Sequence, residues 1–267
     1  MTVPRVDLPM STHLLALGTA AAELGGHAAA AGRDAPVPGC PDWTVADLVA
    51  HQGMVHRWAT ATLEGRDVDD AALEAEGLAA PEPTEWLAAG AATLVAALEG
   101  ADDDLDVRVF LRDPPPPRQF WARRQAHETT VHAVDALAAA LGRAPLAAET
   151  WIDPLVAADG VDELLTGFLT RSTSRLRSER PLRVVVAPTD AALWWQVDVG
   201  EGPPVTTRHA VGPGSAHDGS DADLVLTAPA VPTYLTLWNR GDEATAHAAG
   251  RAAEEALELW RATARVT

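Results

Sequence analysis

The run Gln125-Ala126-His127-Glu128-Thr129-Thr130-Val131-His132-Ala133-Val134-Asp135 organises the chain, because it carries a glutamate and two histidines without a helix breaker. A helix advances by ~100° per residue, so Glu128 and His132, four residues apart, lie about 40° apart on one face. Both side chains can therefore reach a single metal ion. His127 lies five residues before His132, roughly 140° around the helix, and is not predicted to join them.

The spacing of this run differs from the His-Glu-x-x-His motif, in which two histidines four residues apart bind zinc and the glutamate acts as a base. Here the two histidines are five residues apart, so Glu128 is predicted to be a metal ligand instead of a base. A catalytic zinc site usually has three protein ligands and one open position. A third ligand must therefore come from elsewhere in the chain.

The third ligand is predicted to be His51, which lies in the segment 43–56. Thr44 is a suitable helix N-cap, and apolar residues follow it at helical spacing, so a helix is expected here. His51 lies one turn from Leu48 on the apolar face and is therefore predicted to point toward the core. His56, five residues further on, is predicted to point away from the core.

Spacing alone leaves a second interpretation open, because one Glu-x-x-x-His pair is a weak pattern. In that interpretation His51 is a buried histidine, hydrogen-bonded to a neighbouring helix. Glu128 and His132 are then a solvated pair on the surface. The spacing does not decide between these two interpretations.

Composition limits the classes of function. A chain of 267 residues with 47% hydrophobic and 22% charged residues suits one large or two modest globular domains. The net charge of -18 disfavours phosphate backbones and anionic membranes, so neither a nucleic-acid partner nor a membrane is expected. All 20 basic residues are arginine, which excludes Schiff-base chemistry on a lysine.

The single cysteine, Cys40, excludes an internal disulfide, a zinc ribbon and a Cys-x-x-Cys redox pair. Cys40 lies between Gly39 and Pro41 without an adjacent base, so it is not predicted to be a nucleophile. The chain lacks the basic-then-apolar run of a secretory signal and any stretch of ~20 apolar residues. A cytoplasmic location is therefore expected.

The first half of the chain is predicted to be helical. Helices are expected at residues 11–31, 44–64, 84–99 and 119–141. Their predicted N-caps include Ser11 or Thr12, Thr44 and Thr84. The acidic stretch 67–80 has no clear pattern, residues 107–110 are predicted to be a short extended segment, and His13 and His27 are predicted to lie at the surface. A four-helix metal-binding bundle over residues 1–147 follows from this pattern, since facing helices supply the ligands of a bundle-core site.

The second half of the chain combines helices with strands. A helix is expected at 154–171, strands at 182–187, 192–199, 205–209 and 223–227, and helices at 228–238 and 250–264. The stretch 213–220 is predicted to be a loop. Together these elements predict an α+β domain with a small antiparallel sheet over residues 153–267.

Several segments of the chain resemble the mycothiol-dependent maleylpyruvate isomerase family, whose members are DinB-like four-helix metalloenzymes. The segments are 37–51, 55–58, 126–135, 159–165 and 236–240, so the resemblance extends over nearly the whole chain. The family's metal is held by one histidine after a Pro-x-Trp-Thr-Val motif and by a Glu-x-x-x-His pair. The resemblance therefore implies His51, Glu128 and His132 as ligands, and a sterol-carrier-like C-terminal domain.

Two further residues are candidates for the site. Asp135 lies three residues after His132 and could orient its imidazole as a hydrogen-bond acceptor, with a surface salt bridge as the alternative. Arg240 has a family counterpart that is implicated in handling an anionic substrate, and an arginine fork suits a carboxylate. The alternative for Arg240 is a helix C-terminal arginine that is favoured by the helix dipole.

The resulting hypothesis is a metal-dependent isomerase or S-transferase that uses mycothiol or a similar thiol on a small electrophilic, carboxylated substrate. Zn²⁺ is the expected ion, although two imidazoles and a carboxylate also suit Ni²⁺ and Fe²⁺. A second hypothesis is a metal-dependent hydrolase or lyase in which the same ion activates water. A third is a non-catalytic protein whose C-terminal domain binds a small hydrophobic ligand.

Overall fold

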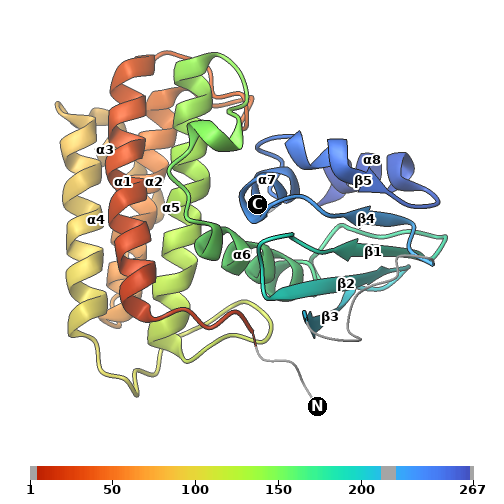
Figure 1. The fold of residues 1–267 in the computed structure, drawn as a ribbon. Coiled ribbons are helices and arrows are strands. Elements are labelled where there is room, and N and C mark those ends of the chain that lie inside the picture. The colour runs from red at the N-terminus through yellow and green to blue at the C-terminus, as the bar shows by residue number, and fades with distance from the viewer. Residues whose placement is uncertain (1–4, 212–220, 265–267) are drawn as a thin grey trace. The chain divides into compact units, whose positions relative to one another are not determined.

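The computed structural model describes residues 5–211 and 221–264, which form two compact units (Figure 1). One unit, the helical unit, consists of Pro9–Phe110 and Pro114–Pro145. The other, the C-terminal unit, consists of residues 5–8, Leu111–Asp113 and the described part of Leu146–Thr267. In the described part of the chain, no helix is both long and apolar enough to cross a bilayer.

The helical unit is built on four long helices, as predicted. They are α1 (Met10–Ala31), α2 (Val45–Leu63), α4 (Pro83–Gly100) and α5 (Pro117–Leu141). α1 packs against α4 and α5, and α2 packs against α4 and α5. The core between them is made of fully buried leucines that recur at helical spacing: Leu17, Leu24, Leu48, Leu87, Leu94 and Leu98.

α5 differs from the other helices because nearly its whole length is buried, polar residues included. A helix that is buried on all sides is normally apolar throughout. Here its buried polar side chains include Arg124, Thr129, His132 and Asp135. Buried polar groups need partners, and most of the candidate site is formed by the partners of these side chains.

The helix starts agree with the predicted caps at only one position. Thr44 caps α2 in a capping box: its Oγ1 accepts from the Asp47 amide at 3.4 Å, and its own amide donates to Asp47 Oδ2 at 2.8 Å. The predicted caps of the first and third helices were wrong. α1 follows Pro9 without a side-chain cap, and α4 has Pro83 in its first turn, where the missing amide costs nothing.

The stretch without a clear sequence pattern contains another helix, α3 (Asp70–Ala79), which the sequence analysis missed. The Asp69 side chain caps it by accepting from the Ala72 amide at 3.0 Å. Only Gly77 of α3 is buried, so the helix depends on its cap and on residues of high helix propensity, and it shows little apolar periodicity.

Residues 107–110, which are predicted to be a short extended segment, form no strand in the structure. Phe110 instead packs its ring against two aromatic rings of α5, with centroid distances of 5.2 Å to Phe120 and 5.9 Å to Trp121. Strand residues need a partner strand for their backbone groups. The elements packed around this segment in the helical unit are helices.

Two glycines make room for the Trp86 ring between α2, α3 and α4. A Cβ atom at Gly53 would lie 2.1 Å from a carbon of this ring, and one at Gly77 would lie 2.7 Å from it. The ring cannot easily move away, because its Nε1 donates to Glu76 at 3.0 Å and the Arg57 guanidinium lies 3.6 Å from the ring centroid.

The Gly53→Ala variant is therefore expected to lose about 1–3 kcal/mol of unfolding free energy through overpacking. The matched control is Gly18→Ala on α1, where a Cβ would meet no atom within 4 Å. There the substitution should stabilise the helix by about 0.5–1 kcal/mol. Urea denaturation of both variants measures the difference, and equal stability of the two would contradict the role of Gly53.

The C-terminal unit contains a five-stranded sheet in the order β3-β2-β1-β4-β5. The strands are β1 (Leu182–Val186), β2 (Leu193–Val199), β3 (Val205–Ala210), β4 (Leu224–Leu226) and β5 (Ala248–Ala249). The α+β prediction is confirmed, with one correction: β1 and β4 pair in parallel, so the sheet is mixed. β4 lies on the other side of β1 from β2 and runs in the direction of β1, which only a crossover connection allows.

The helical elements of this unit are mostly those that the sequence predicted. They are α6 (Pro154–Asp162), a π-helical segment (Glu163–Phe168), α7 (Ala230–Leu237) and α8 (Ala253–Thr263), with short 3₁₀ segments at Ala147–Glu149 and Glu243–His247. The predicted helix at 154–171 therefore changes to π-helical geometry at Glu163 and ends at Phe168. The predicted loop at 213–220 lies outside the described residues.

A buried ion pair joins α6 to β3. The Arg208 guanidinium donates to both carboxylate oxygens of Asp162, from Nε at 2.5 Å and from Nη2 at 2.9 Å. Nη2 also donates to Thr166 Oγ1 at 2.8 Å, and Trp195 Nε1 donates to Asp162 Oδ1 at 2.8 Å. Asp162 is completely buried, so these donors replace the water that its carboxylate would otherwise bind.

Candidate metal centre

His51 from α2 and Glu128 and His132 from α5 come together inside the helical unit. Their ligand atoms all lie within 4.8 Å of one another. Glu128 Oε1 lies 3.4 Å from His132 Nε2, and the two imidazole centroids are 5.3 Å apart. Two ligands at ~2.1 Å from a tetrahedral ion are about 3.4 Å apart. The spacing of this trio therefore fits one divalent cation.

The electrostatics of the trio also fit a cation. Burial lowers the pKa of His132, but hydrogen bonds to Asp135 and Glu128 outweigh this and raise the pKa to about 9. Burial raises the pKa of Glu128, but His132 and Arg124 outweigh that effect and hold the pKa well below its ordinary value. The two carboxylates thus stabilise a positive charge at His132, where a metal ion would supply the same charge.

His51 is suited to be a neutral ligand. Burial, followed by the proximity of His132, lowers the pKa of His51 to about 4. A neutral imidazole keeps a lone pair for a metal. The side chain is about a quarter exposed, and its Nδ1 lies 3.8 Å from Glu74 on α3.

Arg124 belongs to this site although the sequence analysis missed it. Its Nη2 donates to Glu128 Oε2 at 3.0 Å, and its side chain is almost completely buried. The two oxygens of Glu128 are thereby divided, with Oε2 toward Arg124 and Oε1 toward His132. A sequence signal existed, because Arg124, Glu128 and His132 recur every four residues on one face of α5.

Asp135 lies behind His132. Its Oδ2 is 3.1 Å from His132 Nδ1, and the thiol of Cys40 donates to the same oxygen at 3.8 Å. Asp135 is only 1% exposed, so it does not make the surface salt bridge that was the alternative. A proton held on Nδ1 by Asp135 leaves Nε2, which faces Glu128, as the coordinating nitrogen.

Trp43 covers the two imidazoles. Its ring centroid lies 4.7 Å from that of His51 and 5.9 Å from that of His132. The Trp43 ring is nearly parallel to that of His132, at an angle of 28°. Trp43 lies just before the capping residue Thr44, so the start of α2 determines its position.

The predicted orientation of His56 was wrong, because this residue is completely buried. Its Nε2 lies 2.9 Å from Gln52 Nε2 and 2.9 Å from Thr129 Oγ1 of α5. Burial and then Arg57 lower the pKa of His56 to about 3, so its imidazole is neutral. α2 packs against α3, α4 and α5, and a face that points away from one helix therefore meets another.

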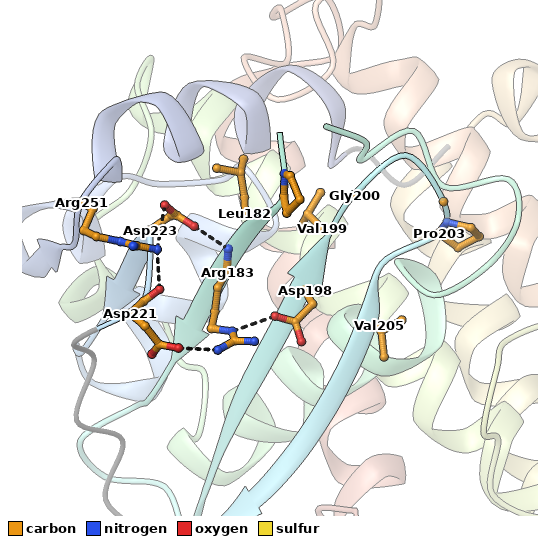
Figure 2. A pocket seen from close by; sticks show the side chains of 12 residues that line it. Leu182, Arg183, Asp198, Val199, Gly200, Pro203, Val205, Asp221, Asp223 and Arg251 are labelled. Carbon is orange, nitrogen blue, oxygen red and sulfur yellow. Dashed lines mark hydrogen bonds and ion pairs between the residues drawn. The ribbon is translucent and has the colours of Figure 1, made fainter. Parts of the chain in front are cut away.

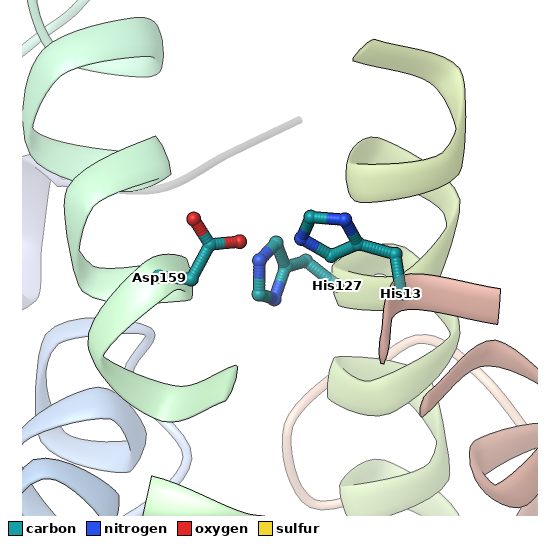
Figure 3. Close-up of side chains that lie close together, drawn as sticks. All are labelled: His13, His127 and Asp159. Atoms are coloured by element: carbon teal, nitrogen blue, oxygen red, sulfur yellow. The ribbon is translucent and has the colours of Figure 1, made fainter. Parts of the chain in front are cut away.

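His13 was also predicted at the surface, and the structure instead buries it on α1. Its ring lies edge-on to that of His127, with centroids 6.3 Å apart (Figure 3). Gln119 Nε2 lies 3.1 Å from His13 Nδ1. His127 projects from a different face of α5 than Glu128 and His132, in agreement with its predicted angle.

Arg240 follows the end of α7 in the C-terminal unit. Its amide donates to the Leu235 carbonyl at 2.7 Å, and its Nη1 donates to the Trp238 carbonyl at 2.9 Å. Asn239 has φ +58°, a left-handed conformation that commonly ends helices. Arg240 therefore binds carbonyls at the C-terminus of α7, and its action on a substrate stays a prediction.

A cavity of about 560 Å³ lies in the C-terminal unit, beside β1 and β2 (Figure 2). The charged side chains that line it are Arg183, Asp198, Asp221, Asp223 and Arg251. They bind one another: Arg183 contacts Asp198 at 2.8 Å and Asp221 at 2.5 Å, and Arg251 contacts Asp223 at 3.5 Å. The remaining lining residues are glycines and apolar residues: Pro181, Leu182, Val199, Gly200, Gly202, Pro203 and Val205.

Comparisons with known proteins agree with this architecture. Residues 14–137 match the family model described as the mycothiol maleylpyruvate isomerase N-terminal domain. A crystal structure of a histidine-to-alanine variant of the mycothiol-dependent maleylpyruvate isomerase has a TM-score of 0.58 and 14% identity to this chain. A crystal structure of that isomerase has a TM-score of 0.56 and 15% identity. Each likeness covers 90% of this chain and 94% of the other. No curated protein sequence matches the chain.

Proposed function

Because the chain belongs, through its residues 14–137, to the mycothiol maleylpyruvate isomerase family, we propose that it is a metal-dependent enzyme that uses a thiol of the mycothiol type. Its reaction is the isomerisation of a small electrophilic carboxylate, or the transfer of the thiol to one. The observation that carries this proposal is the convergence of His51, Glu128 and His132, whose ligand atoms lie within 4.8 Å of one another.

The residues of the site have separate tasks in this proposal. His51, Glu128 and His132 hold the ion, for which Zn²⁺ is the first candidate. Asp135 accepts a hydrogen bond from His132 Nδ1 and so keeps Nε2 available for the ion. Arg124 binds Glu128 Oε2 and so leaves Oε1 for the ion. Three protein ligands leave a fourth position for a thiol.

The bound ion would supply one chemical effect, which is to lower the pKa of a thiol in that fourth position so that it is deprotonated near neutral pH. The thiol would supply the other, which is reversible addition to an activated carbon–carbon double bond that permits rotation about it. Trp43 packs against both imidazoles, whereas the His51 and Glu128 side chains are each about a quarter exposed, so part of the trio faces solvent.

The first test combines elemental analysis with a turnover assay. The purified chain is expected to contain about one zinc ion, and to isomerise maleylpyruvate only when mycothiol is present. Removal of the metal by a chelator should abolish turnover, and Zn²⁺ should restore it. The thiol concentration should stay constant for an isomerase and fall in proportion to product for a transferase.

Other results of this assay would change the proposal. Turnover that needs the metal but no thiol would indicate a hydrolase or lyase that uses activated water. Turnover that persists after complete removal of the metal would contradict the role of the trio. The same assay with Ni²⁺ and Fe²⁺ in place of Zn²⁺ tests the two other ions that this ligand set suits.

A further inference from the structure

A buried polar cluster links the two helices that carry the trio. It consists of Gln52 and His56 on α2 and Thr129 on α5. All three residues have an exposed fraction of 0%. Gln52 directly follows His51, and Thr129 directly follows Glu128. A one-residue step turns each side chain by ~100° from its ligand neighbour. The cluster is therefore next to the trio in sequence but occupies a different face of each helix.

The hydrogen bonds of the cluster cross from α2 to α5. Gln52 Nε2 donates to Thr129 Oγ1 at 3.1 Å and to His56 Nε2 at 2.9 Å. His56 Nε2 also lies 2.9 Å from Thr129 Oγ1. The Gln52 amide nitrogen can only donate, so a neutral His56 accepts at Nε2, and the Thr129 hydroxyl lies within hydrogen-bonding distance of the same nitrogen. Buried hydrogen bonds between side chains of two helices favour one relative position of those helices.

The cluster is a poor way to stabilise a core. Gln52 Oε1 is buried and has no hydrogen-bond partner among the described residues, which costs free energy. Three apolar side chains of similar volume would pack there without that cost. Buried polar groups that are retained under such conditions can specify register instead of stability. Here the register that they would specify is that of His51 relative to Glu128 and His132.

We infer that Gln52, His56 and Thr129 form a positioning lock, which holds α2 and α5 in the register that brings His51 to the same ion as Glu128 and His132. This inference rests on the metal site of the proposed function. The three residues touch neither the ion nor a substrate, and they act through the placement of His51. The loss of the lock changes the geometry and affinity of the metal site, and leaves the fold intact.

Two threonines adjacent in α5 give a matched pair for the test. Thr129 bonds across to α2, whereas Thr130 Oγ1 donates to the Ala126 carbonyl of its own helix at 2.7 Å. Both side chains are buried. Thr129→Val and Thr130→Val therefore remove the same hydroxyl from the same helix, and only the first removes a bond of the lock. A triple variant, Gln52→Leu/His56→Leu/Thr129→Val, removes the whole lock.

Three quantities are measured for each variant. The Zn²⁺ dissociation constant comes from competition with a chromophoric chelator. The other two are the absorption spectrum of bound Co²⁺ and the melting temperature of the metal-free protein. We expect Thr129→Val and the triple variant to bind Zn²⁺ about 10- to 100-fold more weakly, the range typical of residues that support metal ligands. Their Co²⁺ spectra should differ from that of the wild type. Thr130→Val should have the Zn²⁺ affinity and the Co²⁺ spectrum of the wild type. The triple variant without metal should melt no lower than the metal-free wild type.

Two results would overturn the lock. In one, Thr129→Val and the triple variant bind Zn²⁺ and Co²⁺ as the wild type does. In the other, Thr129→Val and Thr130→Val raise the Zn²⁺ dissociation constant by the same factor, which would indicate a general packing effect. Failure of the proposed metal site gives a different result, because the wild-type chain itself would then bind no Zn²⁺. Failure of the lock leaves Zn²⁺ binding by the wild type intact.

Discussion

The His51→Ala variant is expected to lose its zinc and its turnover, while the metal-free protein keeps the stability of the wild type. Removal of a supporting residue typically weakens a metal site 10- to 100-fold, so the loss of a ligand should weaken Zn²⁺ binding by more than about 100-fold. His51 is neutral and partly exposed, so the fold does not depend on its charge. Elemental analysis and thermal melting of the metal-free protein measure the two expectations.

His132→Ala is the informative comparison. It should lose zinc as well, but it should also destabilise the metal-free protein, because His132 lies between Glu128 at 3.4 Å and Asp135 at 3.1 Å. Without the imidazole, the buried Asp135 loses the partner that is expected to carry a positive charge. The control is His27→Ala on α1, where the imidazole Nε2 lies 3.3 Å from the partly exposed carboxylate of Glu23; this variant should keep the zinc content of the wild type. A His51→Ala protein with full zinc content and turnover would refute the proposed ligand set.

Arg208→Met is expected to have the largest effect on stability. Removing one partner of a buried ion pair costs roughly 3–5 kcal/mol, because the other charge stays buried without compensation. Here that charge is Asp162, whose exposed fraction is 0%. Trp195 Nε1, which donates to Asp162 Oδ1 at 2.8 Å, stays in place in this variant. Urea denaturation, followed by tryptophan fluorescence, should show the loss.

Two variants make this prediction specific. Arg183→Met removes an arginine of the same sheet whose ion pairs with Asp198 and Asp221 are partly exposed, so its cost should not exceed about 1 kcal/mol. The double variant Asp162→Leu/Arg208→Met removes both buried charges and should regain much of the lost stability. If Arg208→Met unfolded at the same urea concentration as Arg183→Met, the ion pair would not contribute to the stability of the unit.

Periodicity predicted the elements that bury an apolar stripe, and it failed where another interaction forms the element. α1, α2 and α4 follow from apolar residues, mainly leucines and alanines, at helical spacing. α3 depends on the Asp69 cap and buries only Gly77, so it leaves almost no apolar pattern in the sequence. The parallel pairing of β1 with β4 could not be predicted from these two strands, because strand propensity is the same for either direction.

In the candidate site, too, periodicity predicted some features and missed others. The four-residue spacing of Glu128 and His132, and the apolar face shared by His51 and Leu48, were readable because a helix turns by a constant angle. That angle relates residues of one helix to one another, but it does not say which neighbouring helix each face will meet. His56 was therefore predicted to point away from the core and His13 to lie at the surface, although both are buried.

Local order along the chain thus predicted most of the helices, the strands β1 to β4 and the candidate ligands, since these depend on backbone geometry and on contacts between near neighbours. Packing decided which polar side chains are enclosed and what they bond. Arg124 became a partner of Glu128, and Gln52 a partner of Thr129, because burial of α2 and α5 left these groups no water to bind. The bond between Gln52 and Thr129 joins two helices, so the distance between these residues is set only when the helices pack together.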